Sequence, residues 1–278
     1  LVKTLRCAAT VLGIVAAAIL GAGPAVFGSI VGSIVGSAAA QTLPGIHEGD
    51  SRQSVLSGEG PLAAIGRLNL GGTGHCTGTL IAPSVVLTAA HCLYSHALHR
   101  FLPPSAVHFL AGYSRETYIA HRRARAVLPS PDFLPNPAGV VDLAGNDWAV
   151  VVLEAPIDQP PLPLADVPLG PDTVVEQAGY SQDRAHVLSI DPACRILGRI
   201  EGTPLVAHTC DAVGGDSGSP ILIEGPDGPA VVAVHSSTGP DFGLAIPVGV
   251  FLPAITAYLE TDAPADGAVA EEPAPTDP

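Results

Sequence analysis

Short apolar segments separated by turn residues run through most of the chain. Beginning near Leu62, these segments have the length of strands, are rich in Val, Ile and Leu, and are bounded by Gly, Pro, Asn or Asp. They are Ala63–Leu70, Thr77–Ile81, Val85–Ala89, Val107–Ala111, Ala149–Leu153, Val174–Gly179, Pro220–Ile223 and Val231–Val234. The pattern predicts an all-β fold with more strands than one small sheet accommodates.

Two further segments interrupt this pattern. Val248–Glu260 has a helical period, so a terminal helix is expected there despite Pro253 near its start. Pro156–Pro171 is rich in proline and divides the chain near its middle. It is typical of a linker, and it predicts two lobes joined at about residue 158.

The two ends of the chain are different in composition. Lys3 and Arg6 precede an apolar run, Cys7–Ala40, and the small residues Ala38–Ala40 come directly before Gln41. This order is typical of a signal peptide over residues 1–40 that is removed on export, and a membrane anchor is the alternative if the segment is retained. Residues 262–278 consist mostly of Ala, Pro, Asp and Glu, which predicts a disordered acidic tail.

Charge and cysteine content narrow the class of protein. The net charge is −14 and Lys3 is the only lysine, so a nucleic-acid partner is not expected. Of five cysteines, Cys7 lies in the export segment, and the remaining even number suggests two disulfides in an exported chain. No pair has the Cys-x-x-Cys spacing of a zinc site, and neither a metal nor a cofactor is expected.

Three short motifs carry the candidate chemistry. They are LTAAHC at 87–92, NDWAVV at 146–151 and GGDSGSP at 214–220, which contain His91, Asp147 and Ser217. A serine hydroxyl becomes a nucleophile at neutral pH when an imidazole takes its proton, and a buried carboxylate can hold that imidazole in one tautomer. Asp142 is a rival to Asp147, but only Asp147 directly precedes an apolar strand.

The glycines beside Ser217 add a fourth requirement of this chemistry. An oxyanion formed by attack on a carbonyl needs backbone N–H donors that are already turned toward it. Glycines before the nucleophile allow the backbone to turn in that way. Gly215 and Ser217 are therefore the expected donors of an oxyanion hole.

On these motifs the sequence resembles the chymotrypsin/trypsin-like serine proteases, and in particular the bacterial branch that includes the glutamyl endopeptidases. The segments that carry the resemblance also include CTGTLI at 76–81 and HTCD at 208–211, and the similar region extends from about Ile46 to Leu259. The order His, Asp, Ser separates this arrangement from subtilisin and from the hydrolases with a nucleophile elbow.

The resemblance implies two six-stranded antiparallel β-barrels with the active site between them. It places an N-terminal barrel at 46–158 and a C-terminal barrel with a short helix at 159–261, and it leaves 41–45 as a short propeptide or N-terminal segment. It also implies His91 as general base, Asp147 as its orienting partner and Ser217 as nucleophile. The implied disulfides are Cys76–Cys92 and Cys194–Cys210.

The resemblance leaves the specificity pocket open. Asp211, six residues before Ser217, would select Arg or Lys if it stood at the base of the pocket. His235 instead occupies the position at which glutamyl endopeptidases bind the carboxylate of the substrate, although Ala212 replaces their usual hydroxyl residue. Ser236 is expected to support Asp147, and Thr238 to narrow the rim of the pocket. Cleavage after basic residues and cleavage after Glu both remain open.

Asp216 suggests a route of activation. In family members made as zymogens, the aspartate before the nucleophile pairs with a new N-terminal ammonium. Cleavage near Gly45–Ile46 could free such a group here.

The expected protein is a monomeric, secreted or periplasmic serine endopeptidase acting on protein or peptide substrates, with membrane contact only if residues 1–40 are retained. A non-catalytic binding or adhesion protein on the same fold is the alternative.

Overall fold

The computed structural model describes residues 43–47, 49–56, 59–72, 74–135 and 142–262. The chain divides into two units, Leu1–Ala40 and Gln41–Pro278, and all of the described residues belong to the second. The expected export signal and all but the first residue of the acidic tail lie outside the described residues. Within the described ranges, no helix is both long and apolar enough to cross a membrane.

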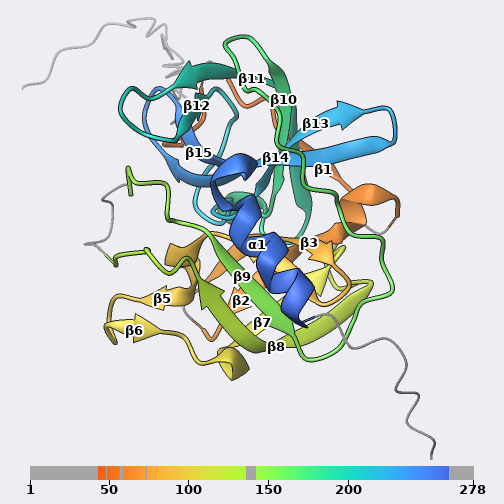
Figure 1. Ribbon diagram of the computed structural model, residues 1–278. Helices are drawn as coiled ribbons and strands as arrows, with labels where there is room; N and C mark the ends of the chain where they lie inside the picture. Colours follow the sequence, from red (N-terminus) through yellow and green to blue (C-terminus); the bar gives the residue numbers. More distant parts are fainter. Residues whose placement is uncertain (1–42, 48, 57–58, 73, 136–141, 263–278) are drawn as a thin grey trace, which may run out of the picture. The chain divides into compact units, whose positions relative to one another are not determined.

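Six strands of the first half form a closed antiparallel barrel, which is drawn in the lower part of Figure 1. Alternate residues of these strands point inward because successive side chains of a strand lie on opposite faces. Phe109, Leu68 and Leu87 are fully buried inside this barrel. In their order around the barrel, the strands are β2 (Ile65–Leu70), β3 (His75–Ala82), β4 (Val85–Thr88), β9 (Ala149–Leu153), β8 (Ala120–Pro129) and β7 (Val107–Ala111).

Six strands of the second half form the other barrel. The sheet closes because β11 pairs with both β10 and β12, and Ile196, Val206 and Ala245 contribute to its core. These strands are β11 (Leu188–Arg199), β10 (Val174–Gly179), β13 (Pro220–Gly225), β14 (Gly228–Thr238), β15 (Gly243–Pro247) and β12 (Val206–His208). The expected all-β fold with two six-stranded antiparallel barrels is confirmed.

The N-terminal segment joins the second barrel. Strand β1 (Gln53–Val55) pairs antiparallel with β11, with Gln53 opposite Ile190. Arg52, 6% exposed, donates to Asp50 and to Asp183, which precedes β11. The expected division placed residues 46–158 in the N-terminal barrel, whereas the structure pairs their first strand with the C-terminal one.

The remaining elements are short. β5 (Tyr94–Ser95) and β6 (Arg100–Phe101) form a separate hairpin. Among the residues that the structure describes, four 3₁₀ turns interrupt the strands, and one of them carries His91. These turns are η1 (Pro61–Ala64), η2 (Ala90–Leu93), η3 (Pro104–Ala106) and η4 (Gln182–Arg184).

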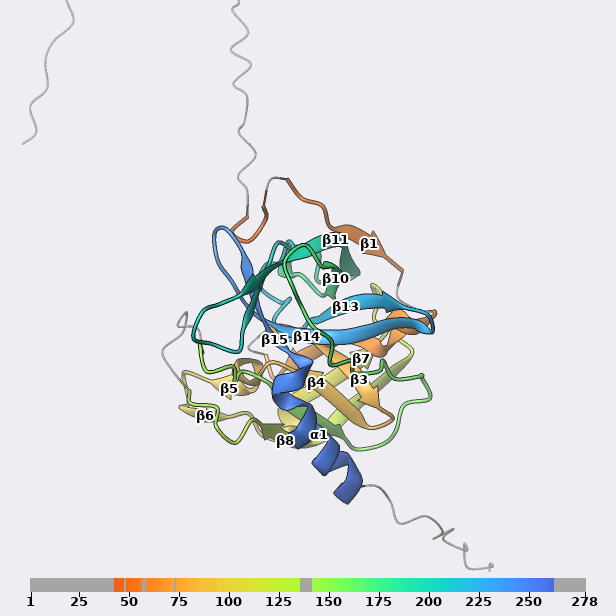
Figure 2. The same cartoon turned by 45° about the horizontal axis from the view of Figure 1, so that its top comes forward.

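The C-terminal helix connects the two barrels. Helix α1 (Val248–Asp262) follows β15 directly and contains Pro253, as the helical pattern predicted. Its buried residues Phe251 and Ile255 face the core, and the ring of Phe251 lies 5.7 Å from that of Trp148, which directly precedes β9. Figures 1 and 2 show the helix beginning at the upper barrel and running along the lower one.

Both expected disulfides are present. Cys76 on β3 is bonded to Cys92 in η2, with an S–S distance of 2.02 Å, and Cys194 on β11 is bonded to Cys210, with an S–S distance of 2.07 Å. The first fixes the turn that carries His91 to the first barrel. The second fixes the segment that leads to GGDSGSP to the second barrel.

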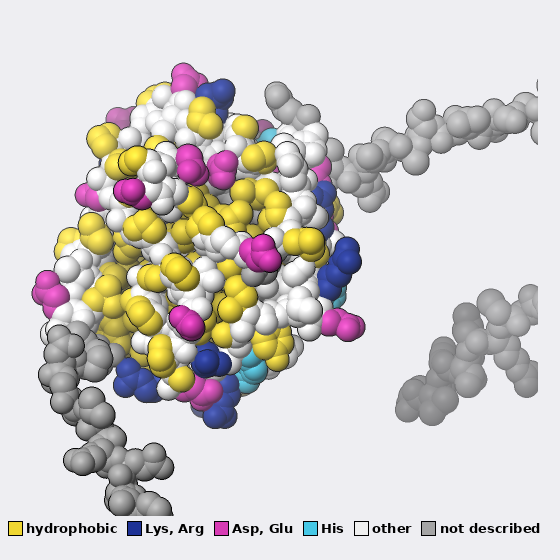
Figure 3. Space-filling model, turned by 90° about the vertical axis from the view of Figure 1, so that its right-hand side faces the viewer, with side chains coloured by type: hydrophobic (Ala, Val, Ile, Leu, Met, Phe, Trp, Pro, Cys, Tyr) yellow, Lys and Arg dark blue, Asp and Glu magenta, His cyan; other side chains and the backbone are white. Residues whose placement is uncertain are grey.

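The surface agrees with the acidic composition. On the face in Figure 3, acidic side chains are scattered among apolar and uncharged atoms, and basic side chains lie mostly at its lower and right margins. That face offers no continuous basic surface of the kind that phosphates require.

Candidate active site

The turn after β4 brings His91 against Asp147. The His91 backbone N–H donates to Asp147 Oδ1 at 2.8 Å, and His91 Nδ1 lies 2.7 Å from Asp147 Oδ2. Ser236 Oγ, from the end of β14, donates to the same Oδ2 at 2.6 Å. Asp147 is 4% exposed and accepts all three bonds, so its carboxylate is held in one orientation. The expectation that Ser236 supports Asp147 agrees with this bond.

This arrangement determines the proton on His91. An ionised carboxylate only accepts hydrogen bonds, so the proton of the neutral imidazole lies on Nδ1 and the lone pair lies on Nε2. Burial lowers the pKa of His91, but its hydrogen bond to Asp147 and the charge of Asp147 outweigh this and raise the pKa above the ordinary value. His91 is therefore a stronger base than an isolated imidazole, which favours uptake of a serine proton.

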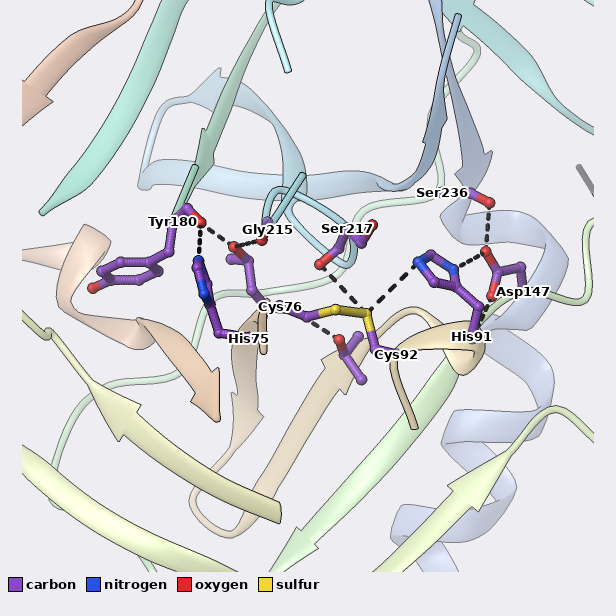
Figure 4. Close-up of a disulfide and its surroundings, with 11 residues drawn as sticks. His75, Cys76, His91, Cys92, Asp147, Tyr180, Gly215, Ser217 and Ser236 are labelled. Atoms are coloured by element: carbon purple, nitrogen blue, oxygen red, sulfur yellow. Dashed lines mark hydrogen bonds and ion pairs between the residues drawn. A yellow bond between two sulfur atoms is a disulfide. The ribbon is translucent and has the colours of Figure 1, made fainter. Parts of the chain in front are cut away.

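Ser217 lies beside His91 on the loop after β12 (Figure 4). Cys92 Sγ is 3.9 Å from His91 Nε2 and 3.8 Å from the Ser217 carbonyl oxygen, so the disulfide contacts both residues. In the described structure no hydrogen bond joins Ser217 Oγ to His91 Nε2. In unliganded enzymes this contact is often long and tightens when substrate binds.

The two expected oxyanion donors are available. Gly215 has φ 94°, a left-handed conformation that glycine adopts readily. The Gly214 carbonyl accepts from Gln182 N at 2.7 Å, and the C=O and N–H of a trans peptide point in opposite directions, so Gly215 N–H points away from Gln182. Within the described part of the chain, neither Gly215 N–H nor Ser217 N–H donates to a protein acceptor.

Asp211 is engaged by the N-terminal segment. Its Oδ1 accepts from His47 N at 2.7 Å, and its Oδ2 accepts from Ser51 N and Ser51 Oγ, both at 2.8 Å. Its backbone N–H donates to Asp191 Oδ2 at 2.9 Å. Asp211 is 3% exposed. Its carboxylate thus anchors residues that precede β1.

The same segment passes between Ala212 and Thr238. The Gly45 carbonyl accepts from Ala212 N at 3.0 Å, and a Cβ at Gly45 would lie 2.0 Å from the Ala212 carbonyl oxygen and 2.2 Å from Thr238 Cγ2. Only glycine fits this gap without movement of its neighbours. A cavity of about 440 Å³ remains between Leu43–Ile46 and Thr238–Pro240.

A chain of buried histidines ends at Thr238. Cys210 N–H donates to His208 Nδ1 at 3.2 Å, so His208 carries its proton on Nε2, which lies 3.1 Å from His235 Nδ1. His235 must then carry its proton on Nε2, which lies 3.0 Å from Thr238 Oγ1. Burial lowers the pKa of His208 to about 3 and that of His235 well below its ordinary value, so both rings are neutral.

These buried rings predict a dependence of stability on pH. The unfolded chain binds a proton at His208 below about pH 6.5, whereas the folded chain does not until about pH 3. Folding stability is therefore lost as the pH falls through this window, by about 1.4 kcal/mol per pH unit for each such histidine. Asp216 has the opposite effect on folding stability. Burial raises its pKa from 3.8 to about 7, so the stability that it contributes at low pH is lost as the pH rises toward 7.

The His208→Gln variant isolates the contribution of one histidine. Between pH 6 and pH 4 the wild type should lose about 2.7 kcal/mol more unfolding free energy than this variant. Urea unfolding at both pH values, followed by the fluorescence of Trp148, measures the difference. Equal losses in the two proteins would show that His208 takes up no extra proton on unfolding.

A second cavity borders the candidate site and is lined in part by His91 and Gly215. It measures about 470 Å³ and lies over the Cys76–Cys92 disulfide. Its lining contains no Asp, Glu, Arg or Lys. The lining residues are Leu70, Gly74, His75, Cys76, His91, Cys92, Tyr94, Ser95, His96, Ala97, Gln182 and Gly215.

One cluster of metal-ligating residue types occurs among the described residues, and it is not a metal site. It consists of Cys76, His91 and Cys92. Both sulfur atoms are in the disulfide, so neither is the thiolate that a metal would require.

Sequence reasoning had not identified three parts of this site. They are His208, which orients His235; the residues before β1, which bind Asp211; and Tyr180–Gln182, which contact the loop of Ser217. Asp142, the rival to Asp147, accepts from Ala144 N and Asn146 N within its own loop.

Comparison with known proteins agrees with the fold and with the family resemblance. The family model described as Trypsin matches residues 57–255, more than half of the chain. A search of curated proteins found no match. Among solved structures, one described as Glu endopeptidase in complex with MPD superposes with a TM-score of 0.64 and 22% identity, covering 77% of this chain and 98% of that one. The chain therefore belongs to the trypsin family of serine endopeptidases.

Proposed function

We propose that the protein cleaves peptide bonds after glutamate through an acyl-enzyme, with Ser217 as nucleophile, His91 as general base and Asp147 as its orienting partner. The observation that carries the catalytic assignment is the set of three bonds to Asp147. They leave His91 Nε2 as the free acceptor beside Ser217.

The reaction follows from these positions. Ser217 Oγ attacks the carbonyl carbon, and its proton passes to His91 Nε2. Gly215 N–H and Ser217 N–H stabilise the oxyanion, and the imidazolium then gives its proton to the leaving amine as the C–N bond breaks. Water attacks the resulting ester by the same route, so that the acid product leaves and Ser217 regains its proton.

The preference for glutamate rests on the hydrogen bonds of Asp211 and His235. Both oxygens of Asp211 are already occupied by His47 and Ser51, so Asp211 has no free oxygen aimed at a substrate cation. His235 Nε2–H donates to Thr238 Oγ1, and a substrate carboxylate that took the place of this contact would meet an N–H and a hydroxyl as donors. Such donors suit a carboxylate, and a buried carboxylate needs hydrogen bonds to offset its loss of water. The Glu endopeptidase found among the solved structures has the same fold.

Export is also part of the proposal. Two disulfides suit an oxidising compartment, because thiols are kept reduced in most cytosols. Removal of residues 1–40 as a signal peptide would deliver the protease outside the cell, where protein or peptide substrates are available.

Labelling of the nucleophile tests the catalytic assignment. A fluorophosphonate should add to the folded protein once, and peptide mapping should place the adduct on Ser217. The His91→Gln variant should react at least about 10²-fold more slowly, because the base that activates the serine is absent. A folded wild type that takes up no label, or takes it up at another serine, would refute the assignment.

A further inference from the structure

The loop that carries the oxyanion donors is held by residues from outside it. The Gly215 carbonyl accepts from Thr77 Oγ1 at 3.0 Å, and the Ser217 carbonyl accepts from Thr77 N at 2.9 Å. Thr77 Oγ1 also accepts from Tyr180 N at 2.9 Å, which fixes its hydroxyl. Thr77 is fully buried on β3, so this support comes from the first barrel.

Asp216 is held from the second barrel. Ser181 Oγ lies 3.0 Å from Asp216 Oδ1 and 2.8 Å from Oδ2, and Val213 N–H donates to Oδ2 at 2.9 Å. Asp216 is 2% exposed and Ser181 is fully buried. Gln182 N–H, next in the chain, holds the Gly214 carbonyl. Adjacent residues after β10 thus fix both a carbonyl and the carboxyl group of this loop.

The N-terminal segment takes a different position. Ile46 N–H donates to the Leu43 carbonyl at 3.0 Å, and Gly45 and His47 bind Ala212 and Asp211. No hydrogen bond to the Asp216 side chain comes from the described residues that precede β2. Burial raises the pKa of Asp216 to about 7, so near neutral pH its carboxyl group is partly protonated and needs no full cation beside it.

We propose that Ser181 and Thr77 are positioning residues that hold the oxyanion loop in its active form, so that the loop does not require a freed N-terminal ammonium at Asp216. The inference rests on the proposed function, since it assigns an active form to that loop. It differs from activation by cleavage at Gly45–Ile46, in which the ammonium of Ile46 would have to take the place of the Ser181 hydroxyl.

Hydrolysis of a small ester tests the oxyanion loop independently of substrate recognition. Hydrolysis of p-nitrophenyl acetate needs Ser217, His91 and the oxyanion donors, but it places no side chain in the specificity pocket. Ser181→Ala should lower kcat for this ester about 10- to 100-fold with little change in KM, less than the effect of deleting an oxyanion donor outright. Ser181→Thr, which keeps the hydroxyl, should recover most of the rate.

The control is another buried serine. Ser189 on β11 is 3% exposed and its Oγ has no hydrogen-bond partner, so Ser189→Ala should leave kcat unchanged. If Ser181→Ala fails to fold, Thr77→Val provides an independent variant of similar volume. Thr77→Val should lower kcat in the same way, and Thr77→Ser should restore it.

Chemical blocking of amines tests the ammonium directly. Because Lys3 is the only lysine, acetic anhydride can modify little besides the N-terminal amine, and hydroxylamine reverses esters formed on hydroxyl groups. The acetylated wild type should hydrolyse the ester at the unmodified rate. Loss of that rate on acetylation, or equal rates in Ser181→Ala and Ser189→Ala, would overturn the inference. A folded wild type without any esterase activity would instead refute the proposed function, and the inference with it.

Discussion

The Asp147→Asn variant should show a kcat about 10⁴-fold below that of the wild type, with the fold intact. The asparagine amide would donate to His91 Nδ1, where the carboxylate accepts in the wild type. The imidazole would then carry its proton on Nε2, facing Ser217, and could no longer accept the serine proton. Steady-state hydrolysis of a peptide substrate measures the effect.

Asp142→Asn is the matched control for this variant. Asp142 lies only five residues earlier and accepts backbone hydrogen bonds from Ala144 and Asn146 in an exposed loop. Its kcat should stay within about twofold of the wild type, because surface changes of this kind have small effects. A tenfold or smaller decrease for Asp147→Asn would mean that His91 does not depend on Asp147 for its tautomer.

The second large effect is expected at His235. Replacing it with Gln should lower kcat/KM for a substrate cleaved after glutamate about 10²-fold, since a hydrogen bond to a buried charged group is worth about 1.5–3 kcal/mol. Hydrolysis of p-nitrophenyl acetate should be unchanged, because that ester has no carboxylate to bind. The two rates together separate recognition from catalysis.

Two controls accompany the His235 variant. His186→Gln changes an exposed histidine that contacts Tyr113, and it should affect neither rate. Asp211→Asn should not create or abolish cleavage after arginine, because Asp211 is bound to the N-terminal segment. If the His235→Gln variant hydrolysed the peptide and the ester with equally reduced rates, the defect would lie in the fold, and a role of His235 in recognition would be contradicted.

The candidate triad could be predicted because each residue lies within a local pattern. His91 lies in the turn that follows one buried strand, Asp147 lies shortly before another, and Ser217 lies in a glycine-rich turn. The resemblance to a known family then indicated how the two barrels bring these three residues together. The apolar strands were predictable for the same reason, since buried segments such as Val85–Thr88 and Ala149–Leu153 consist almost entirely of apolar residues.

The elements that the sequence did not predict lack such patterns. Strand β8 contains Arg122, Arg123 and Arg125, of which Arg122 is half-buried and the other two are exposed, so an apolar alternation is absent. Strand β11 contains Pro192 and alternates less regularly. Both are stabilised by pairing with neighbours that are themselves predictable, β9 for β8 and β10 for β11.

The role of Asp211 depends on contacts between distant residues. The sequence placed it six residues before Ser217, which left its direction open between a substrate cation and the protein itself. Its partners His47 and Ser51 lie 164 and 160 residues earlier, in a polar segment with no periodicity. Ser181 and Asp216 are likewise 35 residues apart, and nothing in either local sequence indicates the bond between them.

A cleavage-site profile tests the central claim most directly. The purified protein is incubated with a mixed peptide library beside Ser217→Ala, and the new termini are identified by mass spectrometry. The account predicts cuts that follow glutamate and that are absent from the Ser217→Ala sample. Cuts after arginine or lysine would contradict the assignment of His235 and would indicate that Asp211 binds the substrate cation. A folded wild type that makes no Ser217-dependent cut would contradict the proposed protease activity.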